Sequence, residues 1–300
     1  MTDLIEIVGA YLLGFVVTAV LWSRSRRIFE GYVFQRHNYR DHSLPTAVGI
    51  LLPLAAAFVV GAHAVIFDVG RSIMGPGSVG WAVLGDVGPT TVELAVAFAF
   101  LGMLDDIGGL GESGGFSGHL KALIEGRVTT GFIKMVGGPF LALAILSGGP
   151  QDGRVGYLRD AALVCLAANL ANLFDRAPGR VNKVGQLALV VLALSTLDHR
   201  LVPVALVIGA AGALLGPDLR EVFMLGDAGS NVIGAVLGFG AVVATTPTQR
   251  WIVLVVLLAL NVSSEFVSFS RIIDAVGPLR ALDRLGSPHR GGPGAPRASR

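Results

Sequence analysis

Residues 90–106 read TTVELAVAFAFLGMLDD, an apolar run that ends in two adjacent carboxylates, Asp105 and Asp106. Ionised carboxylates at the end of a membrane helix are costly unless they face water, a partner or a cation. Two further apolar stretches meet an aspartate in the same way, one at Asp175 and one at Asp227. If all of them lie on one membrane face, they predict a divalent-cation site, because hard oxygen ligands suit Mg²⁺ or Mn²⁺.

The composition around this run is that of an integral membrane protein. Of 300 residues, 53% are hydrophobic and 15% are charged, whereas a soluble domain carries roughly 25% charged residues. Glycine is frequent, with 41 residues, as in packed transmembrane bundles. The sequence contains no recognisable nucleotide-binding loop of the Gly-Lys-Ser/Thr kind and no nucleic-acid motif.

Apolar runs of membrane-spanning length predict an all-α, polytopic bundle of about nine or ten transmembrane helices. Residues 1–285 are expected to form a single transmembrane catalytic domain. Residues 286–300, rich in Gly, Pro and Arg, are expected to be a disordered basic cytoplasmic tail. The predicted spans are residues 3–22, 45–67, 90–104, 131–147, 159–174, 184–197, 201–216, 228–245 and 251–270.

The distribution of Lys and Arg predicts the orientation of the bundle. With nine spans, one side of the membrane receives 18 of these residues and the other receives 5. Basic residues collect on the cytoplasmic side, so we expect the N-terminus outside and the C-terminus in the cytoplasm. The same count places all the aspartate clusters on the cytoplasmic side, although the aspartates played no part in it.

Further polar residues lie near the Asp105-Asp106 pair, called the diacid below. Adjacent carboxylates at a helix end point about 100° apart, so one can bind a metal while the other serves a substrate or acts as a base. Lys121, in the stretch GFSGHLK of residues 115–121, is close enough along the chain to neutralise a phosphate or Asp106. The alternative is a lysine that only extends to the membrane interface.

A second polar group ends at Asp175. Asn169 and Asn172 precede it at intervals of three, which keeps the three side chains on one stripe of a helix. Such a stripe either joins helices or lines a polar site, and both readings stay open. The basic residues that follow suit a polyanion such as pyrophosphate: Arg176, Arg180 and Lys183.

The third group lies in FMLGDAGSN, residues 223–231, around Asp227. An aspartate at a helix start followed by small residues is compatible with a simple N-cap. The small residues also allow another backbone or a ligand to approach closely.

Taken together, these motifs resemble the polyprenyl-phosphate N-acetylhexosamine-1-phosphate transferase family. It includes the bacterial phospho-muramoyl-pentapeptide translocase and the GlcNAc-1-phosphate transferases that start cell-envelope polymers. The resemblance covers roughly residues 40–240 and rests on LGMLDD, GFSGHLK, NLANLFD and FMLGDAGSN, in that order. It implies a ten-helix bundle with the N-terminus outside, in a bacterial plasma membrane.

The resemblance also implies an activity. A sugar-1-phosphate would pass from a UDP-sugar to undecaprenyl or another polyprenyl phosphate, with Mg²⁺ or Mn²⁺ as cofactor and UMP as product. Asp105 and Asp106 stand for the family's diacid, and Lys121 resembles its phosphate-neutralising lysine. Asn172 and Asp175 correspond to its nucleotide-side stripe. Asp227 would bind the metal, with help from Asp105.

The chain departs from the family pattern in two places. Pro178 stands where a second acid is usual, and the C-terminal His motif is reduced to Ser287-Pro288-His289-Arg290. These departures keep an alternative open, a catalytically weakened relative that acts as a lipid-binding or envelope-assembly scaffold. A carrier is a third reading, although Glu93 and Glu265 are predicted near span ends. The sugar, the polymer served and the formation of a homodimer stay open.

Overall fold

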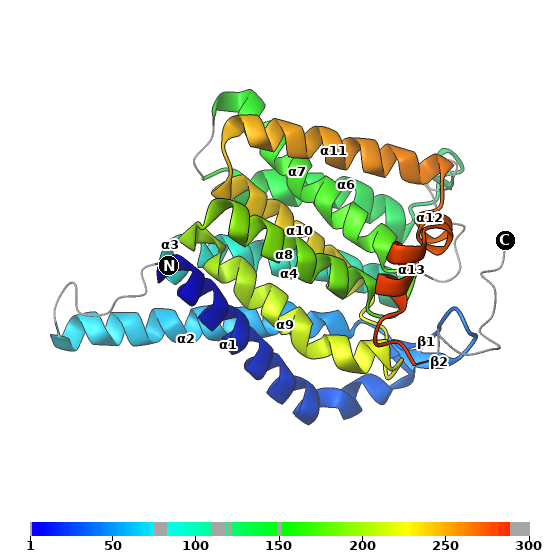
Figure 1. Cartoon of the computed structure of the whole chain (residues 1–300), viewed down its shortest axis with the longest axis horizontal. Helices are drawn as coiled ribbons and strands as arrows, with labels where there is room; N and C mark the ends of the chain where they lie inside the picture. Colours follow the sequence, from blue (N-terminus) through cyan, green and yellow to red (C-terminus); the bar gives the residue numbers. More distant parts are fainter. Residues whose placement is uncertain (1, 75–82, 110–117, 119–121, 149–151, 289–300) are drawn as a thin grey trace.

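The chain folds into an all-α bundle in the computed structural model, which describes residues 2–74, 83–109, 118, 122–148 and 152–288 (Figure 1). Each predicted span coincides with a long helix, so the predicted all-α fold class is confirmed. Helices α1, α2, α9, α10 and α11 are long and apolar enough to cross a membrane. The long helices are α1 (Thr2–Ser25), α2 (Leu51–Met74), α4 (Gly88–Gly108), α6 (Thr130–Leu146), α7 (Gly153–Phe174), α8 (Arg180–Thr196), α9 (Val202–Leu219), α10 (Asp227–Ala244) and α11 (Pro247–Phe266).

Short elements connect or extend these helices. Among the described residues, the only strands form one antiparallel hairpin, which pairs Gln35 with Pro45 and His37 with Ser43. The short elements are η1 (Arg26–Glu30), η2 (Tyr32–Phe34), β1 (Gln35–His37), β2 (Ser43–Pro45), η3 (Val48–Ile50), α3 (Val83–Asp86), η4 (His199–Leu201), α12 (Phe269–Ala275) and α13 (Gly277–Arg284).

The hairpin corrects the predicted start of the second span. The apolar pattern predicts a helix from residue 45, but Pro45 closes β2 and the helix α2 begins at Leu51. A residue that precedes proline avoids the helical region, which favours the extended conformation at Leu44. The turn itself is closed by Asn38, whose side chain accepts hydrogen bonds from the backbone N–H groups of Arg40 and His42, both at 2.9 Å.

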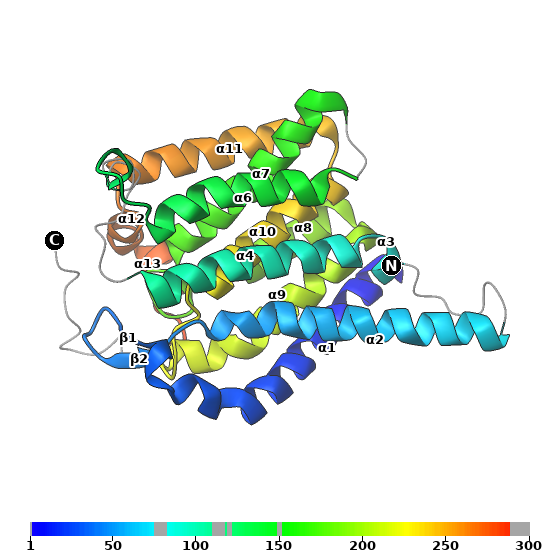
Figure 2. The same cartoon turned by 180° about the vertical axis from the view of Figure 1, so that it is seen from behind.

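Two helices form the centre of the bundle and one lies at its edge. In α10, 78% of the apolar window is buried, and in α9 72%, whereas in α11 only 6% is buried. Both views place α11 along one edge and α1 and α2 along the opposite one (Figures 1 and 2). The hairpin β1–β2 and the helices α12 and α13 lie at the same end of the bundle, and the aspartate clusters lie there too.

Candidate functional site

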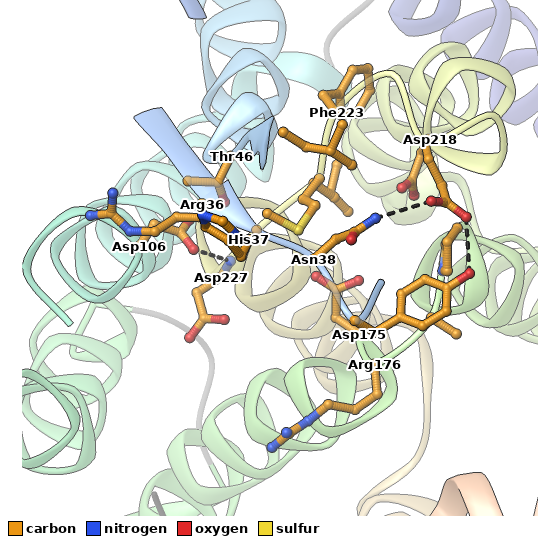
Figure 3. A pocket seen from close by; sticks show the side chains of 18 of the residues that line it. Arg36, His37, Asn38, Thr46, Asp106, Asp175, Arg176, Asp218, Phe223 and Asp227 are labelled. Carbon is orange, nitrogen blue, oxygen red and sulfur yellow. Dashed lines mark hydrogen bonds between the residues drawn. The ribbon is translucent and has the colours of Figure 1, made fainter. Parts of the chain in front are cut away.

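A pocket of about 390 Å³ opens at the end of the bundle beside the β1–β2 hairpin (Figure 3). The predicted aspartates all contribute to its wall. Its described lining contains six carboxylates but only two arginines, so the pocket is strongly acidic. Those charged residues are Asp105, Asp106, Asp175, Asp218, Glu221, Asp227, Arg36 and Arg176.

One lysine joins carboxylates from two helices at this pocket. The Lys134 Nζ atom of α6 lies 3.0 Å from Asp105 Oδ2 of α4 and also contacts Asp227 Oδ2 of α10. Thr130 Oγ1 donates to Asp105 Oδ1 at 2.5 Å, and Asn172 Nδ2 of α7 donates to Asp227 Oδ2 at 2.9 Å. Four helices therefore place their polar side chains around a single positive charge.

Asp106 points in another direction, at the start of α10. Its two carboxylate oxygens accept hydrogen bonds from the backbone N–H groups of Asp227 and Ala228, both at 3.0 Å. These N–H groups have no partner within their own helix, and a negative charge is favourable at a helix N-terminus. Asp106 thus caps α10 across 121 residues of sequence and orients the turn that carries Asp227.

The approach of α4 to α10 depends on Gly102. A Cβ atom at this position would lie 2.2 Å from the carbonyl oxygen of Asp227, a distance that no relaxed contact permits. The sequence therefore places the smallest residue one turn before the diacid, where the two backbones meet. Gly226, directly before α10, has φ of 76°, which glycine adopts without strain.

We expect Gly102→Ala to push α4 away from the start of α10. Overpacking of this kind costs about 1–3 kcal/mol of unfolding free energy. Gly61→Ala is the matched control, because a Cβ on that helical glycine meets nothing within 4 Å. Thermal unfolding in detergent compares the two variants with the unmodified chain. Equal stability of both variants would contradict the close α4–α10 contact.

Asp175 lies at the C-terminus of α7 and is half-buried in the pocket wall. Burial and the nearby carboxylates of Asp218 and Asp227 raise its pKa well above the ordinary value of an aspartate, and Arg176 only partly offsets this. The Asp175 carboxyl therefore tends to hold its proton. A cation that enters the pocket would favour its ionised form.

Three predicted substrate-binding residues make their contacts elsewhere. Asn169 Nδ2 donates to Asn261 Oδ1 at 2.7 Å, so this amide joins α7 to α11. The Arg180 guanidinium forms two hydrogen bonds with the Asp283 carboxylate, at 2.7 and 2.9 Å. Lys183 Nζ donates to the carbonyl oxygens of Leu282 and Asp283. Of the predicted basic residues after Asp175, Arg176 does line the pocket.

The predicted lysine, Lys121, lies outside the described residues. Lys134 contacts the two aspartates, but sequence reasoning used it only in the charge count. The available signal was its position, because Lys134 is the fifth residue of an apolar helix that begins at Thr130, after the N-cap Thr129. A charge placed inside such a run needs a partner in the bundle.

The β1–β2 hairpin forms the outer wall of the pocket and is held at both ends. Glu221 accepts hydrogen bonds from Asn38 Nδ2 at 3.0 Å and from the Tyr39 hydroxyl at 2.9 Å. The Arg36 guanidinium donates to the carbonyl oxygen of Ile107 at 2.7 Å, directly beside the diacid. Figure 3 shows Arg36, Asn38 and Asp227 around the same opening.

The carboxylates of the pocket are candidate ligands for a divalent cation. Among the described residues, no group of three or more His, Cys, Asp or Glu side chains is arranged to hold a metal ion. The donor chemistry nevertheless fits, because carboxylates of Asp105 and Asp227 converge on one positively charged atom. A cation bound by both carboxylates would take the place that the Lys134 ammonium now holds.

No protein-family model matches the chain, and no curated protein is significantly similar to it.

Proposed function

We propose that the chain transfers a sugar-1-phosphate, N-acetylhexosamine-1-phosphate by family resemblance, from a UDP-sugar to a polyprenyl phosphate and releases UMP. The observation that supports this most is the contact of Lys134 with both Asp105 and Asp227, two residues that line an acidic pocket at one end of an apolar bundle. Three of the four motifs on which the family resemblance rests, LGMLDD, NLANLFD and FMLGDAGSN, contribute residues to this pocket.

The charges of the two substrates explain the need for a cation. A pyrophosphate and a lipid phosphate repel each other, and the ionised carboxylates in the wall repel both. Asp227 and Asp105 would hold Mg²⁺, which when bound offsets the charge of the pyrophosphate. Arg36 and Arg176 add fixed positive charge at the rim of the same pocket.

The chain's own residues then have separate tasks. Lys134, released from its two carboxylates, would stabilise the charge on the transferred phosphoryl group. A lipid phosphate oxygen attacks the β-phosphorus of the UDP-sugar, and the bond from that phosphorus to the bridging oxygen breaks, so UMP leaves. A phosphate monoester has a second pKa near 6 and is mostly dianionic at neutral pH, so the attack needs little general-base help. Asp106, with both oxygens bound to α10, therefore acts as a positioning residue.

We also propose that the pocket opens on the cytoplasmic side of the membrane. Nucleotide sugars are cytoplasmic, and the excess of Lys and Arg on the pocket side supports a cytoplasmic position for it. The chain would then be a multi-pass protein of the bacterial plasma membrane, with its N-terminus outside.

The test is a transfer assay with purified protein. Undecaprenyl phosphate, Mg²⁺ and a panel of UDP-sugars are mixed with the chain, UMP is quantified, and the lipid product is identified by mass spectrometry. We expect UMP and lipid-linked sugar phosphate in equal amounts with at least one donor. Lipid binding without UMP release from any donor would contradict the transferase and favour the scaffold. UMP release without lipid would indicate a hydrolase.

A further inference from the structure

The C-terminal helices α12 and α13 begin where a lipid-facing helix ends. Helix α11 is exposed along nearly its whole apolar length and ends at Phe266, and α12 begins at Phe269. The Phe269 ring stacks on Phe174 at the end of α7, with ring centroids 5.2 Å apart. The segment therefore lies against the bundle at the depth where the spans leave the membrane.

The contacts that hold α13 to the bundle are polar. Asp283, the buried residue of α13, receives both hydrogen bonds of the Arg180 guanidinium. Arg180 also donates to Ser270 Oγ at 2.8 Å, which fixes α12. The face of α13 that packs against the bundle therefore carries a buried ion pair. A surface helix of a soluble protein usually packs its apolar face against the core, so α13 has the opposite arrangement.

Three leucines form an exposed apolar strip on α13 and at its C-cap. Leu279 and Leu282 of α13 and the C-cap residue Leu285 recur at intervals of three and are 43%, 51% and 67% exposed. Lys183 binds the carbonyl oxygens of this helix from α8, and on α8 the next outward residues, Val184 and Leu187, are exposed as well. The leucines therefore continue the apolar outer surface of α8 toward the pocket end.

Exposed arginines accompany these leucines. Among the described residues, the guanidinium of Arg280 donates only to the carbonyl oxygen of Asp274, at 3.3 Å, and that of Arg284 lies 3.5 Å from the Asp274 carboxylate. Arg271 is exposed on α12. Leucines that enter the acyl boundary beside guanidinium groups at headgroup height are the pattern of an interfacial helix, and guanidinium binds phosphate well.

We propose that α12 and α13 form an interfacial segment that binds the anionic phospholipid surface at the pocket end of the bundle. Leu279, Leu282 and Leu285 insert below the headgroups, and Arg271, Arg280 and Arg284 bind lipid phosphates. The Arg180–Asp283 pair links this segment to the α7–α8 turn, which carries the pocket residues Asp175 and Arg176. The partner is the membrane itself, and the inference does not depend on the transferase activity.

The test measures the depth of the segment in nanodiscs that contain the full chain. A fluorescent label is placed at Leu282→Cys in a Cys165→Ala background, with Leu187→Cys as the lipid-facing control and His42→Cys as the aqueous control. We expect lipid-borne quenchers near the headgroups to quench the labels at 282 and 187. Iodide in the buffer is expected to quench only the label at 42.

The arginines are tested by lipid charge. Replacing phosphatidylcholine by phosphatidylglycerol should increase lipid quenching at 282, and Arg280→Gln with Arg284→Gln should remove that increase, since each arginine near an anionic surface is worth about fivefold in partitioning. Iodide quenching at 282 equal to that at 42 overturns the proposal. Disulfide-linked dimers of the unlabelled Leu282→Cys variant without lipid quenching of the labelled one also overturn it, in favour of a second copy. If lipid quenching at 282 is the same with phosphatidylcholine and with phosphatidylglycerol, the proposed role of the arginines is wrong.

Discussion

Asp227→Asn is expected to lower sugar-phosphate transfer by about 10³-fold or more, because the substitution removes a charged ligand and keeps the side-chain shape. Asp227 contacts Lys134 and accepts a hydrogen bond from Asn172, so the substitution removes one of the two carboxylate charges that face Lys134. The measurement is UMP release under saturating UDP-sugar and polyprenyl phosphate, with Mg²⁺ varied.

Asp198→Asn is the matched control for this substitution. Asp198 caps η4, accepts hydrogen bonds from Arg200 and does not line the pocket, so transfer should stay within about twofold of the unmodified chain. Thermal unfolding of both variants verifies that they are folded. A folded Asp227→Asn variant with normal turnover would rule out Asp227 as a metal ligand.

Lys134→Met is expected to have opposite effects on transfer and on cation binding. Under the proposed function, transfer should fall about 10²–10³-fold, because the variant lacks the positive charge that is proposed to stabilise the transferred phosphoryl group. The affinity for Mn²⁺ in the absence of substrate should rise about tenfold or more, because two carboxylates lose their shared counter-ion and repel each other. Mn²⁺ binding is followed by electron paramagnetic resonance of the free ion, independently of turnover.

Lys183→Met is the matched control for the expected rise in Mn²⁺ affinity. It also removes a lysine at the same end of the bundle, but one that does not contact Asp105 or Asp227. Lys183 bonds two main-chain carbonyls of α13, so its removal should leave the Mn²⁺ affinity unchanged. Mn²⁺ should also raise the unfolding temperature of Lys134→Met more than that of the unmodified chain. If Lys134→Met binds Mn²⁺ no more tightly than the unmodified chain, Asp105 and Asp227 do not share a cation.

The helices of this bundle were predictable because hydrophobic runs of fixed length are a local property. The residues at which these helices begin and end were harder to predict. The predicted start at residue 45 was wrong because the polar segment before Pro45 pairs with residues 35–37, and such pairing is decided by the turn and by Glu221, far along the chain. The predicted end at 270 was too late, since α11 stops at Phe266 and α12 begins anew.

The residues of the site were predicted more readily than their contacts. Asp105, Asp175 and Asp227 stand out because charge at the end of an apolar run is unusual. The partners of Asp105 and Asp227 lie on other helices. A local pattern can show that Lys134 needs a partner, but it does not show which residues are paired. Arg180 seemed suited to a pyrophosphate because of its neighbours, yet its carboxylate partner comes 103 residues later. Asp106 reads as a possible base in sequence and is a helix cap in space.

The cap that Asp106 provides has a consequence for biosynthesis. Helix α4 leaves the ribosome long before α10. The partners of Asp105, Thr130 and Lys134, follow 25 and 29 residues later, but the N–H groups that Asp106 caps follow only after 121 and 122 residues. Until then the Asp106 carboxylate has no helix end to cap and must stay hydrated. The pocket therefore stays incomplete until α10 has been translated, and a nascent chain halted before that point would lack the wall that α10 provides.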